Sequence, residues 1–540
     1  MPGWNFADVW EAVADTLPDA PAQAQGARRS TWREFDQRAD GIARVLLDGG
    51  AQRQDKVAQY LYNCPEYLES LFGIVKAALV PVNTNYRYAD DELIYLWDNA
   101  DAVAVVFHGT FADRLEGLRA RVPRVKTWIW VDDGSGPCPS WAVAFEEGAA
   151  SGASAGRTVP PWERTGDDLY MLYTGGTTGM PKGVMWRQED LFLTLNAASL
   201  GVRYPEDGGL DGVRAGLEKP GPVCLPAPPL MHGTGAFTSF NALFSGGSVI
   251  TLESRSFDAA EMLDAIERER VNVLPIVGDA FAKPMLRALD SNPGKWDISS
   301  LMVVVSSGVM WSEETKQGLL KHHAGMLLVD AYSSSEALGM GQSVSSAGGT
   351  SKTAKFALGD NARVIDENGR DVTPGSGVIG RVAVKGRTPV GYYKDPEKSA
   401  ATFVELDDGR YSIPGDYATV EADGTLRLLG RGSVCINTGG EKVYPEEVEE
   451  VLKQHPSVLD AVAVGVPNEK FGEAITAVVE PVPGADAVDE ADVITYVKSK
   501  LAAYKAPKRV LTVDTIGRAP NGKVDYKRLQ QLAVERVGAP

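Results

Sequence analysis

The segment Tyr173–Val184, "YTGGTTGMPKGV", holds four glycines, three threonines and one lysine. Glycines let a backbone curl so that its N–H groups face one side, and threonine hydroxyls add donors of the kind that bind phosphate oxygens. The apolar run "LYMLYT" that leads into the segment is typical of a strand, which would hold such a loop in place. The pattern therefore predicts an anion-binding loop anchored by a strand.

This loop differs from a Walker A loop, because Lys182 lies between proline and glycine where that pattern needs Gly-Lys-Ser/Thr. Two other formal motif matches lack the right context. "GASAG" at 152–156 fits GxSxG, but it lies in the Gly-, Ala-, Ser- and Pro-rich stretch 148–161, which predicts a surface loop. "GSGVIG" at 375–380 fits GxGxxG, but it precedes a strand-like run and predicts a turn.

Composition narrows the class of protein. The 540 residues include 54 Lys+Arg and 72 Asp+Glu, a formal net charge of -18, which argues against a general nucleic-acid or anionic-membrane binder. The four cysteines form no CxxC pair, and neither a zinc site nor a disulfide framework is expected. The N-terminus does not resemble a signal peptide and no transmembrane segment is expected, so the sequence predicts a cytoplasmic location.

Short apolar runs alternate with helical patterns along most of the chain, as in "KVAQYLYN" followed by "PEYLESLFGIVKAAL". Such alternation predicts an α/β fold with parallel layers, and Asp258 is an N-cap candidate for one of the helices. The pattern changes near Gly430. We therefore expect a large N-terminal domain of layered α/β subdomains at 1–430 and a small α+β C-terminal domain at 431–540.

Further motifs follow the glycine-rich segment in a fixed order. They are "PLMHGTG" from Pro229, "SSGVMWS" from Ser306, "DAYSSSEALG" from Asp330, "GDYA" from Gly415, "GRGSVCINTGGEKVYPEEVE" from Gly430 and "PNGKVDYKRL" from Pro520. Together they resemble the adenylate-forming superfamily, which includes acyl-CoA synthetases, over essentially the whole chain. The resemblance implies that a carboxylate attacks the α-phosphate of ATP and that CoA then displaces AMP, with Mg²⁺ as the metal.

The resemblance also implies roles for the residues that match each motif. The β- and γ-phosphates of ATP would be held by Thr174, Gly175, Gly176, Thr177, Thr178 and Lys182. Glu336 would ligate Mg²⁺, and Ser335 would contact phosphate. Tyr332 would stack on adenine, with Gly308 and Val309 on the other side of the base.

The remaining motifs would complete the site. Asp416 and Arg431 would bind the ribose, because a carboxylate can accept hydrogen bonds from two vicinal hydroxyls. Lys523 would place a positive charge where negative charge accumulates in adenylation, and His232 would lie beside the acyl pocket. Gly439 and Gly440 would help to form a channel for pantetheine. The residues expected to be catalytic are Lys523, Glu336, Thr178 and His232.

Two departures from the family pattern bear on the mechanism and on the pocket. Ser433-Val434 replaces the charged pair at which the C-terminal domain usually rotates, and Ser333 replaces a glycine where the acyl pocket meets the adenylate. Both features, with the two longest motifs, resemble actinobacterial ligases of steroid side-chain acids. We therefore favour a steroid side-chain acid as substrate and place medium- or long-chain fatty acids second.

Other functions stay open at this point. A ligase that loads a carrier protein, an oxygenase of the luciferase type and a non-enzymatic nucleotide-binding regulator could share the same motifs. The helical stretch "GTGAFTSFNALF" after His232 is a candidate lining of the acyl pocket. The expected partners are a small carboxylic acid, ATP and CoA, and a homodimer is left open.

Overall fold

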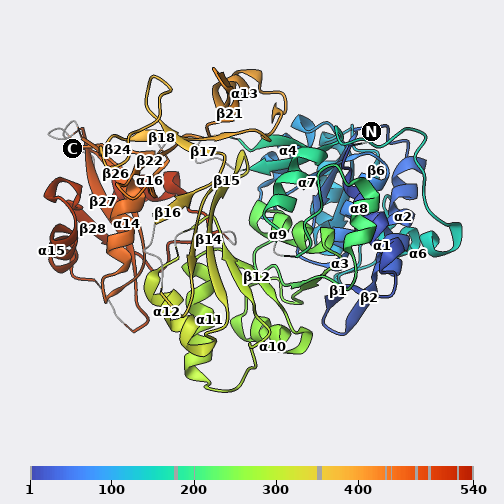
Figure 1. Cartoon of the computed structure of the whole chain (residues 1–540), viewed down its shortest axis with the longest axis horizontal. Helices are drawn as coiled ribbons and strands as arrows, with labels where there is room; N and C mark the ends of the chain where they lie inside the picture. The colour runs from blue at the N-terminus through green and yellow to red at the C-terminus, as the bar shows by residue number, and fades with distance from the viewer. Residues whose placement is uncertain are drawn as a thin grey trace.

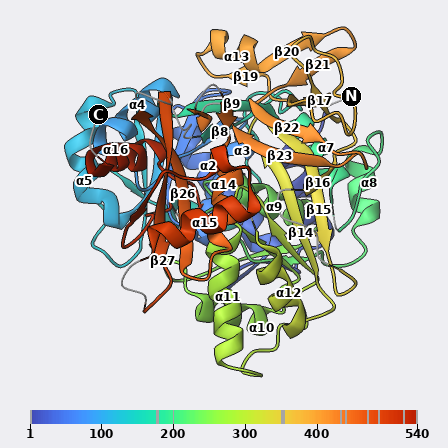
Figure 2. The same cartoon turned by 90° about the vertical axis from the view of Figure 1, so that its left-hand side faces the viewer.

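The computed structural model describes residues 3–174, 180–199, 201–309, 311–349, 355–431, 434–438, 441–468, 472–484, 488–519 and 522–537. The C-terminal part of the chain, in orange and red, lies at the opposite end of the molecule from its N-terminal helices (Figure 1). In the view turned by 90°, this C-terminal part faces the reader (Figure 2).

One sheet carries the glycine-rich segment. Its strand order is β19-β9-β8-β4-β3-β5-β6-β7; the strands from β8 to β7 are parallel, β9 is antiparallel to β8, and β19 is antiparallel to β9. The strands are β3 (Lys56–Tyr60), β4 (Val80–Asn83), β5 (Ala102–His108), β6 (Thr127–Val131), β7 (Val143–Ala144), β8 (Leu169–Thr174), β9 (Lys182–Arg187) and β19 (Gly391–Tyr392). The strand predicted before the loop is thus confirmed as β8.

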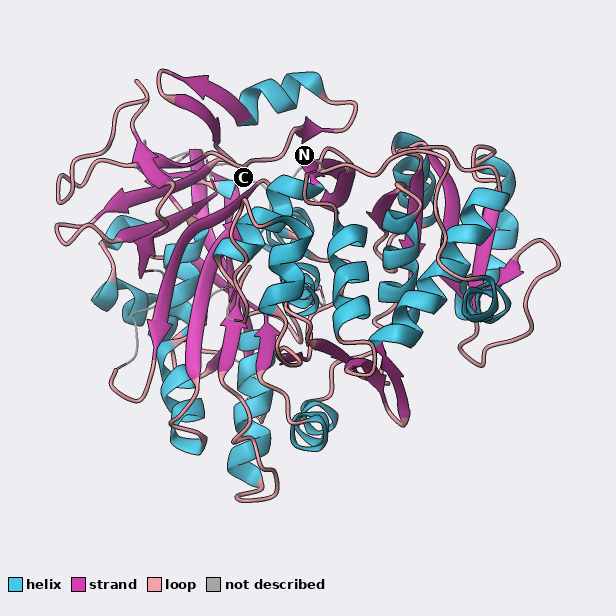
Figure 3. Cartoon of the chain, turned by 45° about the vertical axis from the view of Figure 1, so that its right-hand side comes forward, coloured by secondary structure: helices cyan, strands magenta, loops and turns pink. Residues whose placement is uncertain are grey.

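A second, larger sheet has the order β2-β1-β11-β10-β12-β13-β14-β15-β16-β23-β22-β18-β21-β20, with β17 beside β18. Its first strands are β1 (Pro21–Gln25), β2 (Arg28–Thr31), β10 (Val223–Cys224), β11 (Ser248–Thr251), β12 (Val273–Ile276), β13 (Val303–Ser306), β14 (Leu327–Ser334) and β15 (Ala337–Ser345). The others are β16 (Lys355–Leu358), β17 (Ala362–Ile365), β18 (Gly380–Lys385), β20 (Phe403–Leu406), β21 (Gly409–Ser412), β22 (Asp416–Val420) and β23 (Leu426–Arg431). Figure 3 shows its long strands on the left of the view.

Helices cover these sheets. They are α1 (Phe6–Thr16), α2 (Trp32–Asp48), α3 (Pro65–Lys76), α4 (Asp90–Asn99), α5 (Ala112–Leu118), α6 (Phe145–Ala155), α7 (Gln188–Ala197), α8 (Gly209–Gly216), α9 (Gly233–Phe244), α10 (Ala259–Glu269), α11 (Asp279–Ser291), α12 (Glu313–His322) and α13 (Pro396–Thr402). The side chain of Asp258 accepts hydrogen bonds from the backbone N–H groups of Ala260 and Glu261, which confirms it as the N-cap of α10.

The C-terminal region forms a separate small α+β layer, as predicted. Its sheet has the order β25-β24-β27-β26, with β28 beside β27. The elements are β24 (Ile436–Thr438), β25 (Glu441–Val443), α14 (Pro445–Lys453), β26 (Val458–Asn468), β27 (Gly472–Pro481), α15 (Glu490–Lys500), β28 (Arg509–Thr512) and α16 (Tyr526–Val537). Alternate residues of β26 point to opposite faces, so Ala461 joins the core under α14 and α15 while Val462 joins the core under α16.

The predicted surface loop at 148–161 is wrong over its first half, because α6 continues to Ala155. Its small residues serve close helix packing against α2. A Cβ on Gly152 would lie 1.7 Å from the carbonyl oxygen of Gln37, and a Cβ on Gly41 would lie 2.2 Å from that of Gly148. The turn predicted at 375–380 is confirmed, since Gly375 and Gly377 have φ values of 75° and 70° and β18 begins at Gly380.

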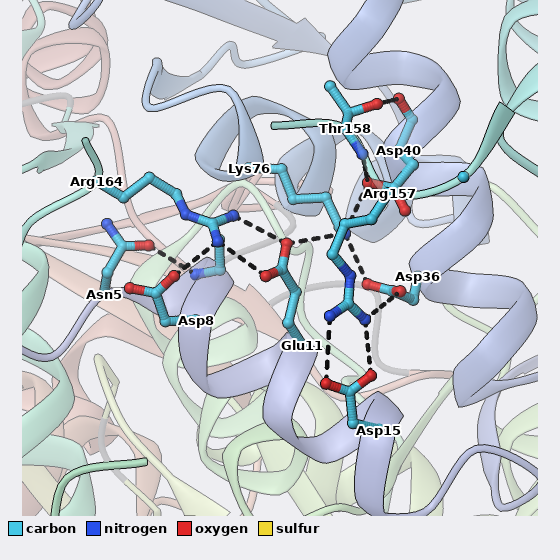
Figure 4. A network of polar contacts seen from close by, with 12 residues as sticks. Asn5, Asp8, Glu11, Asp15, Asp36, Asp40, Lys76, Arg157, Thr158 and Arg164 are labelled. Atoms are coloured by element: carbon cyan, nitrogen blue, oxygen red, sulfur yellow. Dashed lines mark hydrogen bonds and ion pairs between the residues drawn. The ribbon is translucent and has the colours of Figure 1, made fainter. Parts of the chain in front are cut away.

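A group of charges that is buried around Lys76 and reaches the surface at Asp15 and Arg157 ties the N-terminal helices together (Figure 4). Lys76, at the end of α3, is fully buried, and its ammonium lies 3.0, 2.7 and 2.8 Å from carboxylate oxygens of Glu11, Asp36 and Asp40. Two arginines of the segment that leads to β8 close the group, which we call the Lys76 network: Asp8, Glu11, Asp15, Asp36, Asp40, Lys76, Arg157 and Arg164. Among the described residues, no helix is long and apolar enough to span a bilayer.

Candidate active site

The two ends of the glycine-rich segment face each other across a β-hairpin. Thr174 is the last residue of β8 and Lys182 the first of β9, and their Cα atoms are paired in the ladder. Buried Asn83 fixes the end of β8: its amide nitrogen donates to the carbonyls of Tyr173 (2.9 Å) and Met231 (2.7 Å), and its oxygen accepts from the N–H of Tyr173 (2.6 Å). Gly175, Gly176, Thr177 and Thr178 lie outside the described residues.

A chain of contacts links Lys182 to Glu336. The Lys182 ammonium lies 2.6 Å from the Asp395 carboxylate and 5.7 Å from the centre of the Tyr392 ring. The Tyr392 hydroxyl in turn donates to Oε1 of Glu336 over 2.9 Å, and Glu336 is buried. β19 pairs with β9 and brings Tyr392 to this place, although it follows Lys182 by about two hundred residues.

The indole N–H of Trp186 holds the neighbouring backbone, since it donates to the carbonyl oxygen of Ser335 over 2.9 Å. The structure thus brings Lys182, Ser335 and Glu336 together beside the mouth of the hairpin. Among the described residues, there is no cluster of three or more His, Cys, Asp or Glu side chains that could hold a metal by themselves.

The residues predicted to bind the nucleoside lie along one stretch of the large sheet. Gly308 and Val309 follow β13, Tyr332 lies near the end of the adjacent parallel strand β14, and Gly308 has a φ of 97°. The Tyr332 ring packs against Phe356 of β16 with centroids 5.3 Å apart. Two strands further, Asp416 of β22 pairs in register with Arg431 of β23, and Asp416 is buried.

Lys523 approaches this region from the C-terminal domain. Gly522 has a φ of 72°, and a Cβ placed on it would lie 2.7 Å from a methyl group of Val277 and 2.8 Å from one of Val309. Lys523 itself is exposed, but it is close enough to His232 for its charge to act on that ring. Burial first, and then the Lys523 charge, lower the pKa of His232 to about 3.

A cavity of about 790 Å³, partly open to solvent, lies between the two domains. Among the predicted site residues that the structure describes, Val309 alone lines it, and Arg518 and Asp460 border it from the C-terminal side. We therefore locate the candidate active site at the open end of the β8–β9 hairpin and at the strand ends of the large sheet. The cavity lies beside this site.

The region around 437–442 can be compared with its prediction only in part. Ile436–Thr438 and Glu441–Val443 form a β-hairpin, but Gly439 and Gly440 lie outside the described residues, as does Ser433 of the atypical hinge pair. The candidate lining helix is confirmed as a helix, α9. Its Phe240 and Phe244 are buried and pack against Phe6 and Trp10 in the core.

Asn83, Tyr392 and Asp395 were missed in the sequence. Asn83 ends a buried strand, and a polar side chain in that position is a weak signal for a role at the carboxyl edge of a sheet. Tyr392 and Asp395 carry no local signal, because their relation to Lys182 depends on the pairing of β19 with β9.

Comparisons with known proteins agree with this architecture. Residues 10–393 match the family model described as AMP-binding enzyme, and residues 447–523 match that of the AMP-binding enzyme C-terminal domain. The ATP-bound structure of MatB from Rhodopseudomonas palustris superposes with a TM-score of 0.79 at 28% identity, over 99% of this chain and 100% of that one. An anthranilate CoA ligase with anthranoyl-AMP has a TM-score of 0.82 at 21% identity, which shows the shared fold.

Curated relatives match over nearly their whole length. The 3-oxocholest-4-en-26-oate–CoA ligase of Rhodococcus rhodochrous is 42% identical, over 97% of this chain and 95% of its own. A medium/long-chain-fatty-acid–CoA/3-oxocholest-4-en-26-oate–CoA ligase of Mycolicibacterium smegmatis is 40% identical, over 98% and 97%. The chain belongs to the AMP-binding enzyme family. Within that family it is an AMP-forming acid–CoA ligase, which uses ATP and CoA.

Proposed function

We propose that this protein activates a steroid side-chain carboxylic acid, and fatty acids as secondary substrates, by way of an acyl-adenylate. In the first half-reaction a carboxylate oxygen attacks the α-phosphorus of ATP and pyrophosphate leaves. In the second, the thiol of CoA attacks the acyl carbon, AMP leaves and the thiol proton is released. The observation that carries the proposal is the approach of Lys523 to His232, with Gly522 against Val309, at the strand ends of the large sheet.

Each predicted residue has a task in this scheme. Lys182 and the threonines of the loop bind the β- and γ-phosphates, and Asp395 and Tyr392 orient Lys182. Tyr332 stacks on adenine, and Asp416 with Arg431 binds the ribose hydroxyls. Lys523 stabilises the negative charge that develops between the acid and the α-phosphate, where a point charge is most effective.

His232 suits a place beside the reacting carboxylate because its ring remains neutral. The pKa of about 3 means that no positive charge on His232 competes with Lys523 for the carboxylate near neutral pH. After the first half-reaction, rotation of the C-terminal domain withdraws Lys523 and brings the 437–442 region to the adenylate, where Gly439 and Gly440 leave room for pantetheine.

The residues present fit a magnesium ion held jointly with ATP. Mg²⁺ is commonly bound by one or two carboxylates together with substrate phosphates, and buried Glu336, oriented by the Tyr392 hydroxyl, supplies one carboxylate beside the hairpin mouth. When bound, the ion would neutralise phosphate charge. The hydrogen bond from Tyr392 would keep the Glu336 carboxylate in one orientation toward the ion.

The choice of acid rests on the two full-length relatives whose names include 3-oxocholest-4-en-26-oate. A rigid ring system loses little conformational entropy on binding, which favours a large nucleus with a short carboxylated side chain. A linear acid gains about 0.8 kcal/mol for each buried methylene, so activity on fatty acids should rise with chain length until the end of the pocket is reached.

The deciding experiment compares kcat/KM for thioester formation from 3-oxocholest-4-en-26-oate, octanoate and palmitate, with ATP, Mg²⁺ and CoA under one set of conditions. We expect the steroid acid to be preferred. A preference of about tenfold or more for either fatty acid, equivalent to about 1.4 kcal/mol, would reverse the assignment. Adenylate formation without thioester would point to a carrier protein as the acceptor.

Three properties inferred from the sequence belong to the same proposal. We place the domain boundary at 430/431, and a cytoplasmic location agrees with CoA as co-substrate. Sedimentation of the purified chain, with and without ATP, would decide between a monomer and a homodimer.

A further inference from the structure

Two backbone hydrogen bonds close the segment that carries Lys523. We define the Lys523 loop as residues 517–526, of which Pro520 and Asn521 lie outside the described residues. The N–H of Ala519 donates to the carbonyl of Lys523 over 2.9 Å, and the N–H of Gly522 donates to the carbonyl of Ala519 over 2.8 Å. Both bonds are made within the loop, so they do not fix its orientation relative to the rest of the domain. Other contacts must position Lys523.

Arg518 makes those contacts from the base of the loop. Its guanidinium binds Asp460 in a two-pronged arrangement, with Nε and Oδ2 2.6 Å apart and Nη2 and Oδ1 2.8 Å apart. The remaining nitrogen, Nη1, donates to the carbonyl oxygen of Gly522 over 3.0 Å. Arginine can do this because its donors form a rigid planar fork, which a lysine cannot reproduce. One side chain therefore connects a strand residue to the peptide directly before Lys523.

Asp460 is itself held in place. It belongs to β26, its Oδ1 also accepts the N–H of Ala461 over 2.8 Å, and the ammonium of Lys453 lies 3.5 Å away. Arg518, Asp460, Lys453 and Gly522 all belong to the C-terminal domain. Because these four residues lie in one domain, the hydrogen bonds and ion pairs among them would be kept when the C-terminal domain rotates.

We propose that Arg518, clamped by Asp460, is a positioning residue that aims Lys523 at the reacting carboxylate through the Gly522 carbonyl. This inference rests on the proposed role of Lys523 in adenylation. A misplacement of about 1 Å at a reacting group can cost about a hundredfold in rate. Loss of the fork should therefore slow adenylation without removing the lysine and without weakening the binding of ATP.

The test compares wild type with Arg518→Met, Arg518→Lys, Asp460→Asn and Lys523→Ala in two assays: acid-dependent pyrophosphate release, and thioester formation from supplied acyl-adenylate and CoA. We expect Arg518→Met to lower kcat for pyrophosphate release by about tenfold to a hundredfold, while KM for ATP and for the acid stays within about threefold. Arg518→Lys should fall between this variant and wild type. Thioester formation from the adenylate should be retained.

Arg509→Gln is the matched control, because it breaks another arginine–carboxylate pair of the same domain, with Nε of Arg509 3.0 Å from Oε1 of Glu490, that does not include a residue of the loop. It should leave both half-reactions unchanged. The double variant Arg518→Met with Lys523→Ala should be no slower than Lys523→Ala alone, within about twofold, because Arg518 acts through Lys523. Additive losses in the double variant would overturn the inference.

The outcomes separate this inference from the proposal on which it depends. Adenylation at the wild-type rate in Lys523→Ala would remove the role of the lysine, and the positioning role with it. A loss in Lys523→Ala together with unchanged rates in Arg518→Met would overturn only the positioning role. Equal losses of both half-reactions in all the Arg518 and Asp460 variants, with lowered melting temperatures, would assign Arg518 to the stability of the domain.

Discussion

The Lys76 network and the Lys523 loop both contain arginine–carboxylate pairs, but the first serves the stability of its domain and the second serves catalysis. Both contain arginine–carboxylate pairs with more than one close contact, and both involve a lysine. Lys76 is fully buried among carboxylates from α1 and α2, whereas Lys523 is exposed at the edge of a turn. A lysine buried among carboxylates of its own domain can only stabilise that domain. A lysine exposed on a turn can approach a substrate.

The electrostatics of the first region follow from its burial. Burial alone lowers the pKa of Lys76, but the carboxylates around it outweigh burial and raise that pKa above its ordinary value. Burial also raises the pKa of Glu11, yet Arg164 and Lys76 lower it to about 2. The charged forms are thus retained in the fold, and breaking one partner should be costly.

The largest expected effect is on stability. Lys76→Met leaves Asp40 buried without its cation and leaves Asp36 with Arg157 alone, and removing one partner of a buried ion pair costs about 3–5 kcal/mol. Urea unfolding followed by tryptophan fluorescence should show that loss, while the ratio of the two half-reaction rates stays as in wild type. Lys385→Met, which breaks an exposed pair with Asp408, should cost less than about 1 kcal/mol. Similar costs in both variants would contradict the contrast.

The second effect is on the rate of adenylation, and here stability should stay unchanged. Lys523→Ala should lower acid-dependent pyrophosphate release by about a hundredfold or more, because a charge placed for the transition state is lost. Stability and thioester formation from supplied adenylate should remain close to wild type. Lys527→Ala, an exposed lysine of α16, is the control and should change neither. A loss of stability in Lys523→Ala would mean that this region resembles the Lys76 network after all.

The smallest effect concerns the coupling between Lys523 and His232. Because the Lys523 charge is the second cause of the lowered pKa of His232, Lys523→Ala should raise that pKa, but burial should keep it below the ordinary value of about 6.5. NMR titration of the histidine ring would measure the shift, with His232→Asn to assign the signal among the five histidines. An unchanged pKa would place Lys523 away from His232 in solution.

The lowered pKa of His232 also determines how the stability of the fold changes with pH. The pKa of His232 is lower in the folded chain, so between about pH 6.5 and pH 3 the unfolded chain binds a proton that the folded chain does not. The stabilising contribution is complete above pH 6.5 and is lost as the pH falls toward 3. Lys523→Ala should raise the folded-state pKa and so shorten the pH range over which this stability is lost.

Features that are local, or that recur in a fixed order, could be predicted from the sequence. The strand β8 before the glycine-rich segment, the N-cap at Asp258, the turn before β18 and the separate α+β C-terminal layer follow from short runs of residues, since turn chemistry and periodicity act over a few positions. The order of the motifs indicated the family. The helix α6 was misjudged because glycine and alanine, which are common in loops, are also the residues that allow two helices to pack closely.

Which distant residues meet was settled by the tertiary structure. Lys182 and Asp395 are separated by 213 positions, and Asn83 joins the ends of two segments that are remote from it in sequence. Arg518 is an ordinary charged residue in the sequence until β26 places Asp460 beside it and the turn brings back the Gly522 carbonyl. Such contacts have no signature in composition or spacing, because they are made when whole strands pair and two domains dock, and side-chain chemistry alone does not select the partner.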